Sequence, residues 1–419
     1  MKQGFFKKIA AISAAAALSI GLIGCSSEAG SEKTKDGKVE LKVGTWAGAA
    51  ELQEFQEVVD KVNKESENYK LTIQSIPADY YKKIQTMASG KQAPDLFWLS
   101  QEYIPMYADL GVIAPIDEAT KEVDFDDYYE GALNIGKFDD KLYGLPWINQ
   151  PVMLYYNKKM FEENGVALPD GSWTWDDFEK AASALTKDTN NDGKSDQFGT
   201  VIDGWPNVAN WIWTYGGETI TQDGEVKIDS PESIEGIKMM DKLINESKVT
   251  PNKTQAQNTG GPEMFKTGKV AMFFGGAGDD LEKQVGEQFE VGMTQMPMGT
   301  ENVTSSWIAH TVMSSAAKDK EVAAEALVDL TNAVHDWKIL PPVKSKIDNV
   351  PNIRPEKEYA IEEMKKGSEI SRGFNNQPKQ NEIDNAIWLQ LYEPILLNKK
   401  DPEQAAKDAA AELRKILGQ

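Results

Sequence analysis

The clearest candidate for metal chemistry is an acidic loop, DTNNDGKSDQFG, at residues 188–199. Oxygen-bearing side chains stand at alternating positions of this loop, where a chain that winds around a hard cation can bring them together. Position twelve is Gly199, where calcium loops of this type carry a bidentate glutamate. The sequence therefore predicts either a structural calcium site or a turn stabilised by its own side chains. The predicted ligands are Asp188, Asn190, Asp192 and Asp196, with Gly193 at the sharp turn.

Tryptophan is the second chemical signal, because the acidic chain has 11 of them and many stand in loops or at the ends of elements. A flat aromatic ring suits the C–H face of a sugar, while neighbouring amides and carboxylates bind the sugar hydroxyls. Each of these residues could instead pack in the core. The positions that favour ligand contact most are Trp46, Trp98 and Trp205.

Signatures of catalysis are weak in this sequence. The stretch GALNIGKF has the spacing of a phosphate-binding loop, but Phe138 replaces the hydroxyl residue that would hold magnesium. The two histidines, His310 and His335, lack zinc spacing. A glycosidase needs only two carboxylates, and a chain with 66 acidic residues cannot exclude that pair. Composition alone therefore leaves an enzyme of this class open.

The single cysteine, Cys25, lies at the end of an N-terminal targeting segment. Lysines begin this segment, and an apolar stretch follows that is too short to be assigned as a membrane span. The residues LIGC at 22–25 resemble the lipobox of bacterial lipoproteins. This resemblance implies that residues 1–24 are a signal peptide and that Cys25 carries lipid such as palmitate, while an uncleaved anchor is the alternative. Residues 25–38 lack large apolar side chains, so we expect a flexible tether.

The formal net charge of −21 disfavours two classes of partner. Nucleic acid and anionic lipid surfaces would repel such a chain, so we predict no nucleic-acid partner. Solubility explains most of the acidity, since like charges keep a protein dispersed.

The elements that position these residues alternate between strand and helix. This order predicts an α/β fold with a parallel, doubly wound sheet, in which ligands lie beyond the carboxyl ends of the strands. Trp46 and Trp98 fall near such ends. Hydrophobic spacing places strands at 39–43, 71–73 and 95–99, and helices at 52–62 and 79–89.

The chain is too long for one hydrophobic core, since about 380 residues follow the tether, so we predict two lobes. The stretch KLYGLPWINQPVMLYYN at 141–157 is typical of two extended pieces and is the predicted crossing between the lobes. Helices are expected from Trp173 to Leu185, with Thr174 as N-cap, and after Ser230, where proline occupies the first turn.

Several longer segments resemble bacterial extracellular solute-binding proteins of carbohydrate ABC transporters, the maltose- and multiple-sugar-binding group. The resemblance implies two α/β lobes of the type II, Venus-flytrap kind, joined by crossing hinge strands, with sugar held between them. It implies that 39–145 with 297–343 form lobe 1, and that 146–296 with 344–419 form lobe 2. The segments that carry it are DYYKKIQTMASGKQAPDLFWLS (79–100), KLYGLPW (141–147), LYYNKKMFEENGV (154–166), WTWDDFEKAASALT (173–186) and FKTGKVAMFFGG (265–276).

The same resemblance implies which residues meet the ligand. Gln150 stands where maltose-binding relatives place an acid, and Ala277 and Gly278 stand where they place an aromatic residue. The resemblance therefore does not extend to maltose itself. The predicted ligand-binding residues are Trp46, Tyr80, Trp98, Gln101, Gln150, Trp205, Trp211, Gly276, Asp279 and Trp307.

The function predicted from sequence is capture of an oligosaccharide, closure of the lobes and presentation to the permease subunits of an ABC transporter. We expect a monomer held by lipid at the extracellular face of the cell membrane, without catalysis and without a required cofactor. A lipid-anchored glycosidase and a sugar sensor for a signalling receptor are the alternatives.

Overall fold

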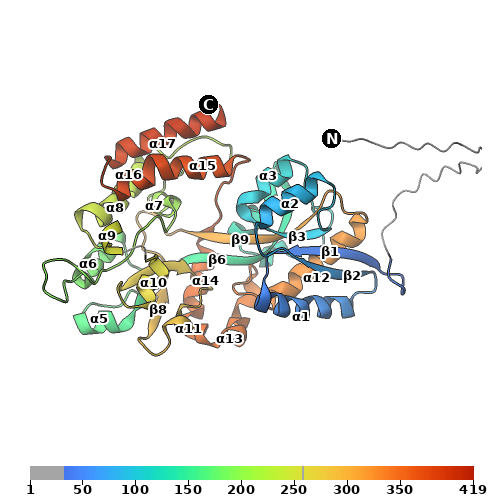
Figure 1. The fold of residues 1–419 in the computed structure, drawn as a ribbon, viewed down its shortest axis with the longest axis horizontal. Coiled ribbons are helices and arrows are strands. Elements are labelled where there is room, and N and C mark those ends of the chain that lie inside the picture. The colour runs from blue at the N-terminus through green and yellow to red at the C-terminus, as the bar shows by residue number, and fades with distance from the viewer. Residues whose placement is uncertain (1–32, 257–258) are drawn as a thin grey trace, which may run out of the picture.

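The computed structural model describes residues 33–256 and 259–419, which form two α/β lobes side by side (Figure 1). The predicted signal peptide, Cys25 and most of the predicted tether lie outside these residues. Within the described ranges, every helix is too short or too polar to cross a lipid bilayer.

The first lobe begins as the sequence predicts, with strands and helices in alternation. β1 pairs in parallel with β2 on one side and with β3 on the other, which confirms the parallel arrangement expected here. The elements are β1 (Val39–Thr45), α1 (Ala49–Glu65), β2 (Tyr69–Ser75), α2 (Tyr80–Ser89), β3 (Leu96–Ser100), η1 (Gln101–Tyr103), α3 (Ile104–Asp109), η2 (Phe125–Asp127), α4 (Glu130–Asn134), β4 (Lys137–Phe138) and β5 (Lys141–Leu142).

Two long strands cross between the lobes, β6 (Gly144–Asn157) and β9 (Thr304–Met313). The prediction of two extended pieces at 141–157 needs correction, because β6 is one strand with an irregularity between Pro146 and Ile148. Its first half pairs with β9, and its second half pairs with strands of the other lobe.

The sheet as a whole is mixed, because the parallel arrangement predicted from the strands before residue 100 continues only as far as β3. The strand order is β2-β1-β3-β9-β6-β7, and β9 runs antiparallel to both of its neighbours. The physical reason is that β9 returns to the first lobe from the second, and therefore enters the sheet from the opposite end.

The second lobe surrounds a core of large aromatic side chains that includes Trp175, Trp211 and Phe274. Thr174 and Asp177 form a capping box at the start of α6, as expected for Thr174. The elements are α5 (Lys158–Asn164), α6 (Trp175–Leu185), α7 (Val208–Trp213), α8 (Pro231–Asp241), η3 (Lys242–Glu246), α9 (Lys253–Ala256), α10 (Gly261–Lys266), β7 (Met272–Gly276), α11 (Leu281–Val285) and β8 (Val291–Thr294).

After β9 the chain completes both lobes with helices. The long helix α12 packs against α1 and the crossing strands, and α15 and α17 lie over the second lobe (Figure 1). The exact lobe boundaries given above stay predictions. The elements are α12 (Lys320–His335), η4 (Lys344–Asn349), α13 (Val350–Ile353), η5 (Pro355–Ala360), α14 (Ile361–Glu369), β10 (Ser371–Arg372), α15 (Gln380–Ile387), η6 (Trp388–Tyr392), α16 (Glu393–Leu396) and α17 (Pro402–Leu417).

Candidate ligand-binding cleft

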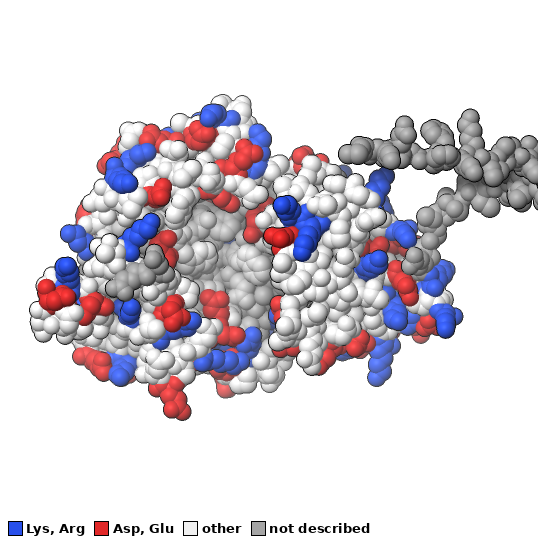
Figure 2. All heavy atoms as spheres, in the orientation of Figure 1, with Lys and Arg blue, Asp and Glu red and all other residues white. Residues whose placement is uncertain are grey.

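The crossing strands β6 and β9 form the floor of a cleft, and a recess separates the lobes in Figure 2. Gln150 and Trp307 stand opposite each other in antiparallel register, so their side chains lie on one face of the strands. Ile148 and Ser305, each two residues away, lie on that same face because side chains alternate along a strand. A hollow borders each pair, one beside Ser305 and Trp307 and one beside Ile148 and Gln150.

The first of these, which we call the carboxylate hollow, has a volume of about 230 Å³. One wall includes Gln101 and Glu102, which come directly after β3 in the chain. The other includes residues of the loop before α7 and of the start of α15. None of the described residues that line it is a lysine, arginine or histidine. Its polar and aromatic lining consists of Gln101, Glu102, Trp205, Asn207, Thr219, Ser305, Trp307, Phe374, Asn375, Asn376, Gln380 and Asp384.

A chain of hydrogen bonds fixes Glu102 on the first wall. The indole Nε1 of Trp307 donates to Ser100 Oγ over 2.9 Å, and that hydroxyl donates in turn to Glu102 Oε2. Burial raises the pKa of the Glu102 carboxyl above its usual value, and the negative charge of Asp384 adds to the effect. Asp384 is thus close enough for its charge to affect the Glu102 carboxyl.

On the facing wall, Gln380 donates from Nε2 to Asp384 Oδ1 over 2.8 Å. Asp384 is an exposed residue, and partial desolvation of its carboxyl by the surrounding protein raises the pKa. Trp205 is 39% exposed, and its Nε1 donates to the carbonyl oxygen of Phe274, which fixes the ring at the edge of the hollow. The wall therefore offers an aromatic surface beside a carboxylate.

Gln101 is a buried residue of the lining, with only 2% of its surface exposed. Its Nε2 donates to the carbonyl oxygen of Ser306 over 3.0 Å. Its Oε1 has no partner among the described residues and lies toward Gly373 on the facing segment, where an added Cβ would come within 2.9 Å of it. A buried acceptor is therefore left unpaired, which costs free energy unless a donor arrives.

The second hollow, which we call the hinge hollow, is larger, at about 840 Å³. Gln150 spans it, because its Oε1 accepts from Gly278 N over 2.7 Å and its Nε2 donates to Ile339 O over 2.6 Å. Its charged lining is balanced, with Lys61, Lys283, Lys338 and Arg354 beside Glu54, Glu57, Asp280 and Asp336. Several of these charges are paired, including Arg354 with Asp280 and Lys338 with Glu51.

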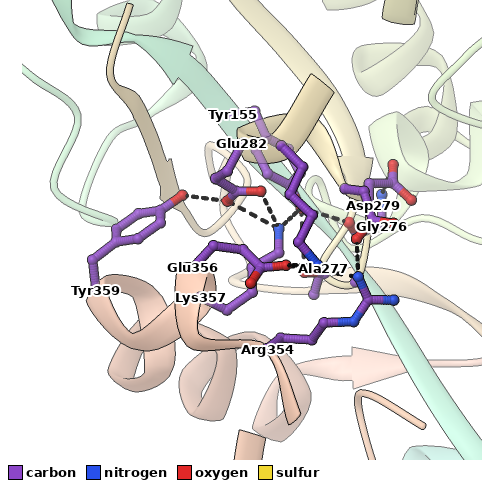
Figure 3. A network of polar contacts seen from close by, with 12 residues as sticks. Tyr155, Gly276, Ala277, Asp279, Glu282, Arg354, Glu356, Lys357 and Tyr359 are labelled. Atoms are coloured by element: carbon purple, nitrogen blue, oxygen red, sulfur yellow. Dashed lines mark hydrogen bonds and ion pairs between the residues drawn. The ribbon is translucent and has the colours of Figure 1, made fainter. Parts of the chain in front are cut away.

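A buried ionic network lies under the glycine-containing turn that borders the hinge hollow (Figure 3). Lys357 has no exposed surface, and its Nζ contacts Glu282 Oε2 at 2.8 Å and Tyr155 Oη at 3.0 Å. Tyr155 donates to the carbonyl oxygen of Gly276 over 2.8 Å, and Tyr359 donates to Glu282 over 2.7 Å. Burial lowers the pKa of Lys357, while the negative charge of Glu282 opposes that change. The network ties the turn after β7 to η5.

The structure distributes the ten predicted ligand residues over three places, and their contact with ligand stays a prediction. Gln101, Trp205 and Trp307 line the carboxylate hollow. Trp46 is half-buried, with its ring centroid 6.2 Å from that of Trp307. The turn residues Gly276 and Asp279 lie beside the hinge hollow, which Gln150 lines, and Asp279 accepts a hydrogen bond from Gly276 N over 3.0 Å.

The other three predicted residues are buried in the lobes. Trp98 and Trp211 have no exposed surface. Tyr80 is buried as well, and its hydroxyl donates to the carbonyl oxygen of Trp98 over 2.8 Å. In this conformation these side chains pack in the cores of the lobes and do not line either hollow.

Sequence reasoning missed Glu102 and Asp384. Glu102 directly follows Gln101 at the end of β3, so its position beyond a parallel strand could have indicated it. Asp384 lies one helical turn after Gln380, but only the tertiary structure brings this helix to the cleft.

The acidic loop at 188–199 forms a compact turn in which its side chains bind its own backbone. Asp188 accepts from Gly193 N over 2.7 Å, and Asp196 accepts from Thr189 N over 2.8 Å. Asn190 accepts from Asp192 N over 2.8 Å, as expected for an Asx turn. No group of three or more His, Cys, Asp or Glu residues within 33–256 and 259–419 is arranged to hold a metal ion. The calcium site stays a prediction.

Comparison with known proteins connects this architecture to one family. Residues 48–331 match the family model described as bacterial extracellular solute-binding protein. A putative binding protein of Brucella abortus (strain 2308) is 25% identical over 420 residues, which cover 96% of this chain and 97% of the relative. The galactooligosaccharide-binding protein of Bacillus subtilis (strain 168) is 24% identical over 425 residues, with 96% of each chain covered.

Among solved structures, an ABC substrate-binding protein from Listeria monocytogenes in complex with cycloalternan superimposes with a TM-score of 0.76. The two sequences are 24% identical, and the superposition covers 91% of this chain and 99% of the other. Both lobes and the crossing strands thus have the same arrangement in the two proteins.

Proposed function

The chain belongs to the bacterial extracellular solute-binding proteins and has their type II two-lobed fold, and on this premise we propose that it binds an oligosaccharide for an ABC transporter. The family and its characterised relatives are binding proteins. The observation that carries the sugar assignment is the combination of Trp205 and Trp307 with amides and carboxylates in one hollow. Aromatic faces pack on sugar rings, and the polar groups bind hydroxyls.

The ligand acts by closing the lobes. Glu102 and Trp307 come from one side of the cleft, while Trp205 and Asp384 come from the other. A sugar that contacts both sides binds the closed form more tightly than the open form, and this difference in affinity drives closure. The closed form is then the one that the permease subunits recognise.

No bond of the sugar is broken in this proposal. Two carboxylates do face the same hollow, which is the minimum that a glycosidase requires. Prolonged incubation with a bound oligosaccharide, followed by chromatography of the sugar, should return it intact. A shortened product would support the glycosidase instead.

We further propose that Cys25 carries lipid and holds a monomer at the outer face of the cell membrane. The support is the lipobox-like sequence at 22–25. Substitution Cys25→Ser should release the protein into the medium, while Ser26→Ala should leave it with the membrane fraction. Retention of the Cys25→Ser protein at the membrane would contradict lipid anchoring.

The binding function is tested by titrating the purified protein with di- and oligosaccharides while following tryptophan fluorescence. We expect the tryptophan fluorescence to rise or fall and then saturate with at least one oligosaccharide, because the surroundings of Trp205 and Trp307 change when the lobes close. A flat response to every sugar, with a response to an amino acid or peptide, would overturn the carbohydrate assignment. Deletion of the neighbouring permease should abolish uptake, whereas a sensor would keep its signalling phenotype.

A further inference from the structure

The carboxylate hollow has an excess of negative charge that its own residues do not neutralise. Glu102 on the first lobe and Asp384 on the second both line it, and no described lining residue is basic. The hinge hollow, on the same face of the crossing strands, has four basic and four acidic residues. The excess is therefore local to one end of the cleft and does not simply follow the acidity of the whole chain.

We propose that the carboxylate hollow binds a sugar unit with a protonated amine, placed between Glu102 and Asp384, so that the ligand is an amino-sugar oligosaccharide. This inference rests on the proposed sugar-binding function and names the chemical class of its ligand.

Among the described residues, the hollow has free acceptors on Asp384 and Gln101, and one free buried donor, Asn376 Nδ2. The described residues donate only one hydrogen bond to the Asp384 carboxylate, from Gln380 to Oδ1, and none to Oδ2. The Oε1 atom of the buried Gln101 has no donor either. An ammonium group offers three donors and no acceptor, whereas a hydroxyl brings one donor together with two lone pairs. The amine therefore suits the free carboxylate oxygen of Asp384 better than a hydroxyl does, while a hydroxyl of the same sugar unit can accept from Asn376 Nδ2.

The electrostatics favour the same ligand. Desolvation raises the pKa of both carboxyls, and the negative charge of Asp384 adds to the effect on Glu102. An ammonium between them stabilises both charged forms through charge-assisted hydrogen bonds. The same lack of basic residues argues against uronic acids and phosphorylated sugars at this end of the cleft.

The position of the two carboxylates also links the amine to lobe closure. Glu102 and Asp384 repel each other when the hollow is empty, because they are like charges on opposite walls. A cation between them reverses the sign of this interaction. The amine therefore contributes most of its binding free energy in the closed form, where both carboxylates reach it.

The test uses three oligosaccharides of one linkage that differ only at carbon 2 of each unit. These are the β-1,4-linked glucosamine, N-acetylglucosamine and glucose trimers, and the same series is run with galactose configuration. The purified protein is titrated with each by calorimetry at a pH where the amine is protonated. We expect the amine form to bind about tenfold or more tightly than both matched neutral forms in at least one series, equal to about 1.4 kcal/mol.

Two variants and one control locate the effect. Glu102→Gln and Asp384→Asn keep the size of each side chain and should each reduce the preference for the amine by about tenfold or more. Glu162→Gln removes one exposed acidic residue from α5 and should leave the preference unchanged. High salt should weaken amine binding in the unmodified protein more than neutral-sugar binding.

The outcomes separate this inference from the proposed function. Equal or tighter binding of neutral sugars, or an amine preference that survives both carboxylate substitutions, would overturn the amino-sugar inference and leave sugar binding intact. Binding of no sugar of any kind would overturn the proposed function itself.

Discussion

The two hollows of the cleft differ in how far the protein satisfies its own polar groups. At the hinge hollow, Gln150 uses both ends of its amide, and Arg354 is paired with Asp280. At the carboxylate hollow, Asp384 and Gln101 keep acceptors without donors. Groups that are already paired fix geometry, whereas unpaired groups gain free energy only when a partner arrives. The comparison supports the proposal that one end shapes the cleft and the other binds the ligand.

Removal of the buried lysine beside the hinge hollow should have one of the two largest effects on stability. Lys357→Met leaves Glu282 buried without its cation, so the free energy of unfolding should fall by about 3–5 kcal/mol. Urea unfolding followed by circular dichroism measures this change. Lys407→Met, which breaks an exposed pair with Glu403, is the control and should change stability far less. Equal effects of the two substitutions would contradict a structural role for the network.

A smaller loss of stability is expected from crowding the turn at the hinge hollow. A Cβ on residue 278 would lie 2.3 Å from Gln150 Nε2, so Gly278→Ala should displace the amide and cost about 1–3 kcal/mol. Gly268→Ala is the comparison variant, because the added carbon meets open space there while the backbone has a positive φ of 69°. Its loss of stability measures backbone strain without crowding. If Gly278→Ala weakens ligand binding without changing stability, the hinge hollow recognises ligand after all.

At the carboxylate hollow, the expected loss is one of affinity. Trp205→Ala removes a half-exposed ring, which should weaken sugar binding by about tenfold, or about 1.4 kcal/mol, and change stability little. Trp211→Ala removes a fully buried ring and should instead lower the free energy of unfolding by about 3–5 kcal/mol. Calorimetric titration and urea unfolding of both variants measure the two effects. The reverse pattern would break the proposed division of roles.

The smallest expected effect concerns pH. The pKa of Glu102 is raised in the folded protein, so its carboxylate becomes protonated at a higher pH than an ordinary glutamate. Ligand affinity should therefore start to fall on acidification while the pH is still above the ordinary glutamate pKa of 4.5. The free energy of unfolding responds to pH in the opposite direction. It falls as the pH rises through the raised pKa of Glu102, because the folded protein disfavours the ionised carboxylate. Glu102→Gln should therefore leave the free energy of unfolding at neutral pH unchanged or slightly higher. A pH-independent affinity would argue that Glu102 does not meet the ligand.

Local signals in the sequence were sufficient for much of the fold. The capping box at Thr174 and the Ser230-Pro231 helix start are encoded within a few residues, and both helices begin as expected. The strand β9 has no such signal, because it is buried on both faces and its partner β6 ends almost 150 residues earlier. Its place in the sheet depends on contacts that no short pattern encodes.

The site could be predicted only in part, for a related reason. Trp46 and Trp98 both lie near strand ends, but Trp46 follows the last residue of β1, while Trp98 is inside β3 and packs into the core. The two tryptophans differ in the direction of their side chains, and this direction depends on the residue at which each strand ends. Asp384 lines the same hollow as Glu102 only because α15 returns to it from a distant part of the chain.

The position of β9 between β3 and β6 also determines when the protein can fold during synthesis. A growing chain makes β3 and β6 early, but the strand that joins them is complete only at Met313. Contacts between distant segments form slowly, and the first lobe cannot close its sheet before the ribosome has made most of the chain. This late completion suits a protein proposed for export, because it keeps the nascent chain open while it passes through a translocation channel.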